Sequence, residues 1–388
     1  MMTTSRQFLA GLSAERFLSE HWQREPLLCR SALPKSRFGI GRKELLALAT
    51  RADVEARLIT REGATWQLER GPLSKPTIKA LPETDWTVLV SDLEVHVPEL
   101  ARVLRQLDFL PSWRIDDLMA SYAVDGGSVG PHFDSYDVFL LQVQGKRRWQ
   151  IAQRFDRTKL RGDTELCILD EFVAEQEWLL EPGDMLYLPP RIAHYGVAEG
   201  ECVTFSLGCR APSLKELAMH FALNAVDRAP SGPLQPETLG FEAREHGAEL
   251  RLQGASLAGL QSTLADLFTF DSECVRRAFA SLVSQPKALF ALEAEELPSQ
   301  RRIARALSGK SALARRRGSR WLSLDLTPAS YLYVDGEEYD ASAAIRFARK
   351  LCETQRLGLR EVQAALKSAP ERALLSALVQ AGQLVISS

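Results

Sequence analysis

Between Leu118 and Arg210 the sequence consists of short strand-like runs separated by turn signals, and this stretch constrains the possible fold more than any other. The runs and turns, in order, are LMASYAV, DGGSVGPH, VFLLQVQG, RRWQIA, LEPGD, MLYLPP and CVTFSLG. Several short strands at this spacing are typical of a β-sandwich or a β-barrel. We therefore expect a mainly β core in this part of the chain.

A histidine and an aspartate stand two residues apart inside this stretch, as His132-Phe-Asp134. Residues i and i+2 of a strand point to the same face, so both side chains can reach one ion. A second histidine, His194, follows EPGDMLYLPPRIA, in which a tight turn leads into a strand. Two imidazoles and one carboxylate form the facial triad of non-haem Fe(II) oxygenases and leave other coordination positions open.

The metal interpretation has a simpler competitor, because an H-x-D pair often arises by chance and a lone histidine is usually a surface or hydrogen-bonded residue. Here the pair follows a glycine-rich turn, and the third candidate ligand lies downstream in the same β-rich stretch. This context favours a metal centre. The remaining histidines lack such partners in the sequence and are interpreted as structural: His21, His96, His220 and His246.

The open positions of such a centre admit a chelating 2-oxo acid and dioxygen. The far carboxylate of 2-oxoglutarate would be a buried charge, so it needs a cation, and arginine can contact it through two hydrogen bonds. The run GKRRW begins the strand after the H-x-D strand, and alternation sends Arg147 and Trp149 to one face and Arg148 to the other. We expect Arg147 to hold the carboxylate; the alternative is a solvated charged turn.

With 388 residues the chain exceeds one ordinary hydrophobic core, and about two or three domains are expected. Ser213-Leu-Lys-Glu216 has capping-box spacing and starts an apolar-periodic helix, and the breaker cluster APSGPLQP and more helical sequence follow. Near the end, helices flank the strand-like runs RWLSLDL and SYLYV. We predict a catalytic domain with an N-terminal decoration over 1–215, a helical connector or dimerisation segment over 216–290, and a winged-helix-like α+β domain over 291–388.

A formal net charge of −2 provides no global basic field for nucleic-acid binding. The local cluster ARRRGSR is open to two interpretations, a contact with ribosomal RNA or a solvated turn, and we favour the turn. The start, MMTTSRQFLAGLSAERF, lacks the apolar core of a signal peptide, and no stretch approaches the roughly 20 apolar residues that span a membrane. Six scattered cysteines without a C-x-x-C pair indicate structural thiols rather than a zinc site or disulfides. We therefore expect a cytoplasmic enzyme without a membrane partner.

The run GGSVGPHFDSYDVFLLQVQGKRRWQIA, followed by LEPGDMLYLPPRIAHYG, resembles the JmjC-type ribosomal oxygenases, particularly their bacterial members. The resemblance covers roughly residues 15–215, and the helical and C-terminal parts agree with the family in order and approximate length. It implies a double-stranded β-helix of the cupin/JmjC type, with Fe(II), 2-oxoglutarate and O2 as cofactor and co-substrates. It also implies homodimerisation through the helical segment and hydroxylation of a ribosomal protein, which in bacterial members is an arginine of large-subunit protein sixteen.

The resemblance also carries residue roles by motif position. His132, Asp134 and His194 match the family's iron ligands. Arg147 matches the basic residue that holds 2-oxoglutarate, and Ser121, on the strand before the glycine-rich turn, matches a further co-substrate contact. Additional candidates for co-substrate binding lie on the last barrel strand: Thr204 and Ser206.

A cationic arginine substrate favours carboxylates and an aromatic face near the mouth of the barrel. The residues of these types that lie close in the sequence are Asp116, Asp117, Tyr136 and Asp137. We take Asp116 and Tyr136 as candidate substrate contacts. All four residues also fit ordinary loop or capping roles.

Two other functions stay open at the level of the sequence. One is a JmjC hydroxylase or demethylase that acts on a lysine or histidine of another protein, with iron and co-substrate unchanged. The other is a cupin sensor fused to a winged helix that works as a metal-dependent DNA-binding regulator. Against the regulator, the C-terminal run REVQAALKSAPER is mixed in charge and not rich in the side chains that read a major groove.

Overall fold

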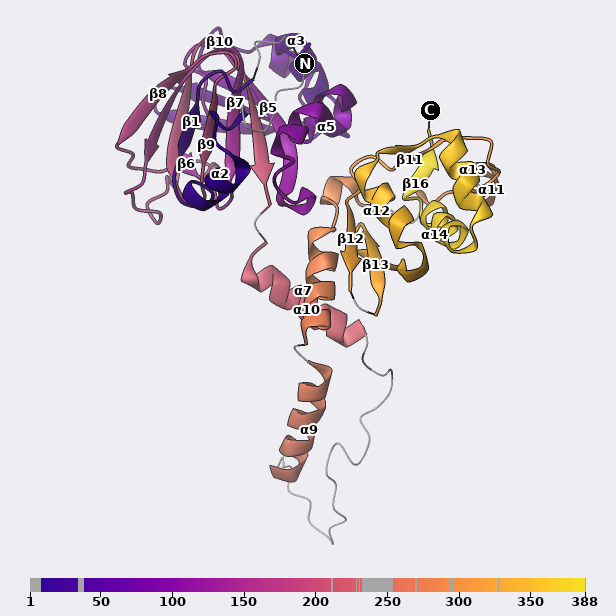
Figure 1. Cartoon of the computed structure of the whole chain (residues 1–388). Helices are drawn as coiled ribbons and strands as arrows, with labels where there is room; N and C mark the ends of the chain where they lie inside the picture. Colours follow the sequence, from indigo (N-terminus) through magenta and orange to yellow (C-terminus); the bar gives the residue numbers. More distant parts are fainter. Residues whose placement is uncertain are drawn as a thin grey trace. The chain divides into compact units, whose positions relative to one another are not determined.

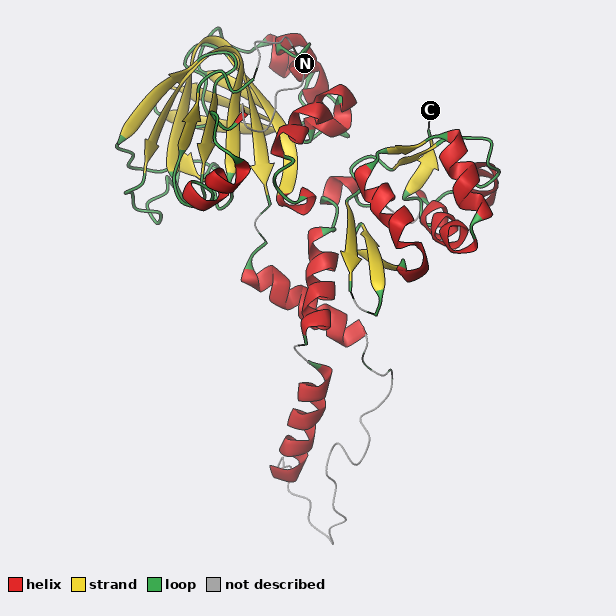
Figure 2. Cartoon of the chain, viewed as in Figure 1, coloured by secondary structure: helices red, strands yellow, loops and turns green. Residues whose placement is uncertain are grey.

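The computed structural model describes residues 8–33, 38–210, 212–227, 229, 231, 254–268, 271–292, 296–326 and 328–387. The chain divides into two compact units, residues 1–211 and 212–388. Strands gather in the first unit and helices dominate the second (Figure 2). The breaker cluster over 229–236 lies largely outside the described residues, and the boundary near residue 290 stays a prediction.

The first unit is built on one sheet in which every described pairing is antiparallel (Figure 1). Its main path runs β1-β9-β7-β10-β5-β4-β2-β3, with β6 paired to β10 and β8 paired to β7. The strands are β1 Leu27–Cys29, β2 Ala56–Glu62, β3 Thr65–Arg70, β4 Trp86–Val90, β5 Ile115–Ala123, β6 His132–Phe133, β7 Val138–Ala152, β8 Gln176–Leu180, β9 Met185–Leu188 and β10 Ala193–Cys209.

Two of these strands are long and irregular in the middle, and they shape the core. The sequence runs VFLLQVQG and RRWQIA, expected as separate strands, form the single strand β7. Gly145 adopts a positive φ of 63° within β7, and a Cβ there would lie 2.0 Å from the carbonyl oxygen of Glu201 in β10. A side chain therefore does not fit at this position, and the glycine lets the paired strands change direction together. The first half of β7 pairs with β9 and the second half with β8.

Strand alternation sends one set of side chains to the main apolar core and the other set to the opposite face of the sheet, which carries a second apolar cluster. Phe139, Leu141, Phe205 and Leu207 belong to the main core cluster, which also contains Phe17 of helix α2 (Ala14–Glu20). The opposite face carries the buried polar side chains discussed below. Among the described residues, the α-helices of the unit are α2 Ala14–Glu20, α3 Arg42–Ala49, α4 Lys75–Lys79, α5 Leu93–His96 and α6 Ala101–Leu104.

The second unit begins at the predicted capping box. The Glu216 backbone N–H donates to Ser213 Oγ at 3.1 Å, the Ser213 N–H donates to Glu216 Oε2 at 2.7 Å, and α7 follows. The helices are α7 Leu214–Asp227, α9 Gly254–Leu267, α10 Ser272–Val283, α11 Gln300–Ala306, α12 Ile345–Glu353, α13 Leu359–Lys367 and α14 Ala369–Gln380. The strands are β11 Leu313–Arg315, β12 Trp321–Asp325, β13 Ser330–Val334, β14 Glu337–Asp340, β15 Arg356–Leu357 and β16 Leu384–Ile386. No helix among the described residues has the length and apolar character needed to cross a membrane.

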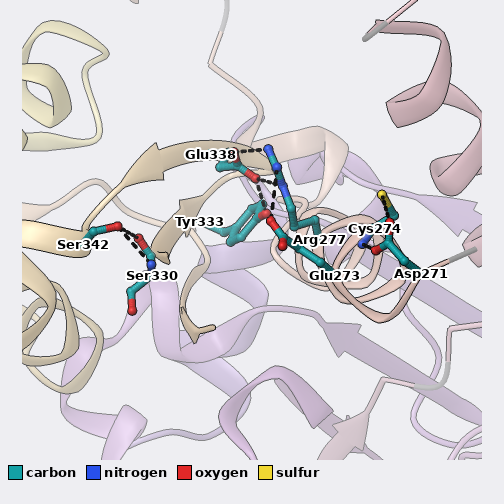
Figure 3. Close-up of polar contacts among 8 residues, drawn as sticks. All are labelled: Asp271, Glu273, Cys274, Arg277, Ser330, Tyr333, Glu338 and Ser342. Atoms are coloured by element: carbon teal, nitrogen blue, oxygen red, sulfur yellow. Dashed lines mark hydrogen bonds and ion pairs between the residues drawn. The ribbon is translucent and has the colours of Figure 1, made fainter. Parts of the chain in front are cut away.

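Helix α10 is fastened to the hairpin of β13 and β14 by a charged cluster (Figure 3). Arg277 donates two hydrogen bonds to the carboxylate of Glu338, with the Nη2 to Oε1 distance at 2.5 Å and the Nε to Oε2 distance at 2.9 Å. The Tyr333 hydroxyl donates to the same carboxylate, and the Arg277 guanidinium lies 4.9 Å from the ring centre of Tyr331. This helix, which lies in the predicted connector, therefore packs with the C-terminal hairpin.

Candidate functional site

The three predicted metal ligands lie together at the start of β10. Strand β6 pairs with β10 so that His132 lies opposite His194, and Asp134 follows β6 directly. The candidate ligand atoms of the three residues all lie within 4.8 Å of one another. His194 Nε2 is 3.6 Å from Asp134 Oδ2, and the two imidazole ring centres are 4.2 Å apart. This spacing lets one metal ion contact all three side chains.

Backbone carbonyls orient both imidazoles. His132 Nδ1 lies 2.9 Å from the carbonyl oxygen of Gly130, and His194 Nδ1 lies 3.0 Å from that of Ile192. A carbonyl oxygen can only accept, so Nδ1 donates its proton in both rings and each Nε2 presents a lone pair. Burial and the neighbouring His132 lower the pKa of His194 to about 4, which keeps this ring neutral near pH 7. The Nε2 atoms of both imidazoles are therefore available as metal ligands.

Arg147 lies on the inward face, as strand alternation predicted, and its side chain is 4% exposed. Its Nη1 donates to Ser121 Oγ at 3.0 Å and to Thr204 Oγ1 at 3.5 Å, and its Nη2 donates to the Gly127 carbonyl oxygen at 3.5 Å. Its Nε has no hydrogen-bond partner. Among the residues that the structure describes, no carboxylate pairs with this guanidinium, and burial lowers its pKa. Burying an arginine without an opposite charge costs free energy unless a bound anion pairs with it, so this site fits the carboxylate of a ligand.

A row of paired strands brings the residues around Arg147 together. Thr204 lies opposite Ser121 of β5 on one side and Gln142 of β7 on the other, and Thr204 Oγ1 donates to Gln142 Oε1 at 2.9 Å. Ser206 is buried two residues further along the same face of β10. Gln142 was not among the predicted residues, because nothing local in the sequence distinguishes it from its neighbours.

Trp149 lies close to both Arg147 and the candidate metal ligand His194. The Arg147 guanidinium lies 5.5 Å from the centre of the Trp149 ring, and that ring lies 5.9 Å from the His194 ring. Gly196, opposite Trp149 in the register of β10, leaves room for it, since a Cβ there would lie 2.6 Å from the indole. Alternation along the GKRRW run was the sequence signal for this residue, although its contact with His194 could not be foreseen.

The candidate substrate residues occupy different environments, with Asp116 and Asp117 at the start of β5 and Tyr136 just before β7. Asp117 is buried and lies opposite Gly208, on the strand face that also carries Ser121. Asp116 is the extra residue where the register of β5 and β10 shifts, and it is partly buried. Burial and the charges of Asp134 and Asp117 raise the pKa of Tyr136, so this phenol lies near both carboxylates.

Asp137 differs from these residues because it is fully buried inside the fold. It accepts hydrogen bonds from the Tyr187 hydroxyl at 2.6 Å and from Gln23 at 3.2 Å. It also pairs with Arg114 at 3.0 Å. These contacts tie the N-terminal segment to the sheet, which is a structural role.

Comparisons with known proteins agree with this architecture. A family model described as the JmjC domain matches residues 102–217, and one described as the ROXA-like winged helix matches residues 263–384. The "Probable ribosomal oxygenase" of Haemophilus influenzae is 43% identical over 211 residues, which are 53% of this chain and 52% of that protein. The chain thus matches about half the length of that relative. The "Ribosomal protein uL16 3-hydroxylase" of Escherichia coli is 32% identical over 326 residues, which cover 84% of this chain and 85% of that protein.

A solved structure gives the same result over nearly the whole length. The structure of YcfD, a ribosomal oxygenase from Escherichia coli, in complex with cobalt and 2-oxoglutarate, has a TM-score of 0.77 at 30% identity and covers 97% of this chain and 99% of that chain. The predicted fold class is confirmed: a cupin-like JmjC core of antiparallel strands precedes a C-terminal winged-helix domain. By these matches over both parts of its sequence, the chain belongs to the JmjC ribosomal oxygenase family.

Proposed function

We propose that this ribosomal protein hydroxylase, a 2-oxoglutarate-dependent dioxygenase, acts on an arginine side chain of the large-subunit ribosomal protein uL16 in the cytoplasm. The observation that carries the proposal is the buried Arg147, which lacks a carboxylate partner among the described residues and lies beside a His-Asp-His cluster. The likeness to a relative named for uL16 3-hydroxylation supports this substrate.

In this proposal His132, Asp134 and His194 hold Fe(II). The fit rests on two imidazoles whose Nε2 atoms are free to coordinate, together with one carboxylate within 4.8 Å. This donor set matches the preference of non-haem Fe(II) and leaves positions for two further ligands. Bound iron supplies the redox chemistry that couples conversion of 2-oxoglutarate to succinate and CO2 with insertion of one oxygen atom into a C–H bond.

Arg147 would receive the far carboxylate of 2-oxoglutarate, with Ser121 and Thr204 holding the guanidinium in place. Both hydroxyls contact Nη1, so the guanidinium is oriented before the ligand arrives. The unpartnered Nε supports this role, because a carboxylate can accept from Nε and a terminal nitrogen together. Ser206, further along the same face, would complete the wall of this pocket.

The substrate arginine would enter near Asp117 and Tyr136. A carboxylate and an aromatic face together suit a guanidinium, which can form hydrogen bonds in its plane and stack on a ring. Tyr136 is 41% exposed, and the charges of Asp117 and Asp134 act on its hydroxyl. Asp116 stays a candidate for a contact at the edge of this region.

Homodimerisation is the second part of the proposal, and helix α7 supports it. Three apolar side chains at helical spacing are exposed on α7: Met219 at 55%, Leu223 at 56% and Val226 at 57%. A helical stripe of this kind is costly in water, and a second copy of the same helix would cover it symmetrically. We therefore propose that the dimer expected from the helical segment forms through this apolar stripe of α7.

The test is hydroxylation of defined peptides. The protein is loaded with Fe(II) and 2-oxoglutarate without oxygen and then exposed to air with arginine-containing peptides of uL16. We expect the mass gain of one oxygen atom together with succinate, and tandem mass spectrometry is expected to locate the oxygen on carbon 3 of the arginine. Peptides in which the arginine is replaced by lysine or histidine serve as controls. Oxidation of those peptides but not of the arginine peptide would contradict the proposed substrate.

A further inference from the structure

We propose that Glu94 and the backbone of Asp92 position the Asp117 carboxylate for the substrate guanidinium. The inference rests on the proposed function, because it concerns the residue expected to contact the substrate arginine. It assigns Glu94 and Asp92 as positioning residues that act through Asp117. Neither of them was a candidate in the sequence.

The turn between β4 and α5 holds the Asp117 carboxylate directly. The backbone N–H of Asp92 donates to Asp117 Oδ2 at 3.3 Å. Asp92 is 3% exposed and has φ 52° and ψ 39°, a left-handed conformation that is uncommon for a residue other than glycine. This conformation costs free energy and persists only where the surroundings maintain it, as is common at functional sites. In this turn it aims a backbone donor at a carboxylate on the neighbouring strand.

Glu94 ties the same turn to β5 one residue beyond Asp117. The Leu118 backbone N–H donates to Glu94 Oε2 at 3.0 Å. The ladder between β4 and β5 ends at the pair of Val90 and Ala120, so Leu118 lies beyond the last β4 partner. The Glu94 carboxyl therefore accepts from the Leu118 N–H at a position where β5 has no partner residue in β4. Its bond fixes the distance between the turn and the strand segment that carries Asp117.

The opposite edge of this segment is held by β10. Asp117 pairs with Gly208 and Leu118 with Leu207, and the register shifts immediately beyond Asp117. A strand end next to such an irregularity has fewer ladder bonds to define its position. On the edge of β5 that faces β4, the hydrogen bonds of Asp92 and Glu94 take the place of the missing ladder bonds. The direction of the Asp117 side chain thus depends on both edges.

The environment of Glu94 agrees with an arrangement built around Asp117. Burial raises the pKa of Glu94 to about 8, and the charges of Asp117 and Asp92 add to the increase. Glu94 therefore carries a proton for much of the time near pH 7, which reduces repulsion against Asp117. A cationic side chain that binds Asp117 then meets an oriented carboxylate whose neighbour Glu94 is uncharged for much of the time.

The test compares Glu94→Ala, Glu94→Gln and Asp117→Ala in the full-length, Fe(II)-loaded protein. Glu94→Ala removes the acceptor for Leu118, and we expect the KM for the uL16 arginine peptide to rise about five- to tenfold, the effect of one lost hydrogen bond. The KM for 2-oxoglutarate should not change. Glu94→Gln retains an acceptor oxygen and should restore the peptide KM to within about twofold of wild type. Glu44→Ala is the matched control, because Glu44 also accepts a backbone N–H, that of Gly41 at 3.1 Å.

The double variant Glu94→Ala with Asp117→Ala separates positioning from general support of the fold. If Glu94 acts through Asp117, the double variant has the same peptide KM as Asp117→Ala alone, since the two effects are not additive. Additive effects, or a peptide KM unchanged by Glu94→Ala, would overturn the inference and leave the proposed function intact. Absence of arginine hydroxylation by the wild-type protein would instead overturn the proposed function, and the inference with it. If Glu94→Ala does not fold, a peptide KM of Glu94→Gln several times above that of Glu44→Ala would also count against positioning by this acceptor.

Discussion

Replacing Arg147 with methionine removes the guanidinium and retains a long apolar chain at an inward-facing position of β7. In the wild-type protein this guanidinium is already withdrawn from water, at 4% exposure, and is held by Ser121 and Thr204. Little further desolvation or ordering of the arginine is then needed when 2-oxoglutarate binds. Truncating one partner of such a buried pair typically costs about 2–5 kcal/mol. Taking about 3 kcal/mol, we expect 2-oxoglutarate to bind about two orders of magnitude more weakly.

The same substitution should have little effect on the ligand-free fold. Arg147 has no carboxylate partner among the described residues, so its removal leaves no opposite charge unpaired. Ser121 Oγ also lies 3.4 Å from the Thr204 carbonyl oxygen, and Thr204 Oγ1 also donates to Gln142, so both hydroxyls retain partners. The free energy of unfolding without ligand should therefore stay within about 1 kcal/mol of wild type.

The assay is calorimetric titration of 2-oxoglutarate into metal-loaded protein without oxygen, with urea unfolding of the ligand-free protein beside it. Arg148→Met is the matched control, because Arg148 is the next residue of β7 but pairs with Glu177 and Glu199 on the outer face. A dissociation constant for Arg147→Met within about threefold of wild type would refute the reasoning, since binding would then not depend on this cation. An equal loss in Arg148→Met would refute it as well.

Four further substitutions test other parts of the structure. His132→Ala removes a candidate ligand and should weaken Mn(II) binding by more than the about 10–100-fold seen for residues that merely support a ligand; unchanged calorimetric binding would exclude His132. Gly196→Ala places a Cβ 2.6 Å from the Trp149 ring and should cost about 1–3 kcal/mol in urea unfolding, so an unchanged midpoint would contradict the packing. The pKa of Glu94 is raised from 4.5 to about 8, so the folded state binds the extra proton and stability falls as pH rises through this window. Glu94→Gln should flatten that decline between pH 5 and pH 8, and an unaltered slope would count against it. Leu223→Asp, at an exposed position of α7, should convert a dimer to a monomer in light scattering; a persistent dimer would place the interface elsewhere.

Local sequence patterns were sufficient for several features of the fold and the candidate site. The capping box at Ser213 marked the start of α7, because its two reciprocal hydrogen bonds involve residues three positions apart. Strand alternation alone placed Arg147 and Arg148 on opposite faces, and the structure shows Arg147 buried and Arg148 in an exposed ion pair. The ligand atoms of His132, Asp134 and His194 lie together as their spacing and flanking turns indicated. Each of these inferences depends on geometry within one element, or on ligand types that one metal requires.

Other features depended on contacts between distant parts of the chain. Ser121, Thr204 and Arg147 meet only because the register of three strands aligns them. The continuity of β7 through Gly145 was missed, since a glycine between two strand-like runs normally signals a turn. The contact of Asp92 with Asp117 also has no local signature, because it joins a left-handed residue of one turn to a side chain of the next strand.

The sequence by itself determined the family, the β-rich core, the candidate metal ligands and the sign of the charge expected to hold the co-substrate, because residue type and period carry that information. Tertiary structure decided which polar side chains surround Arg147 and that this cation has no carboxylate partner among the described residues. It also decided that Asp117 lies opposite Gly208 and that Asp116 is the extra residue at the register shift of β5 and β10. The physical reason is that strand register and irregularities such as the one beside Asp117 are set by cross-strand hydrogen bonds and packing, which no single segment specifies.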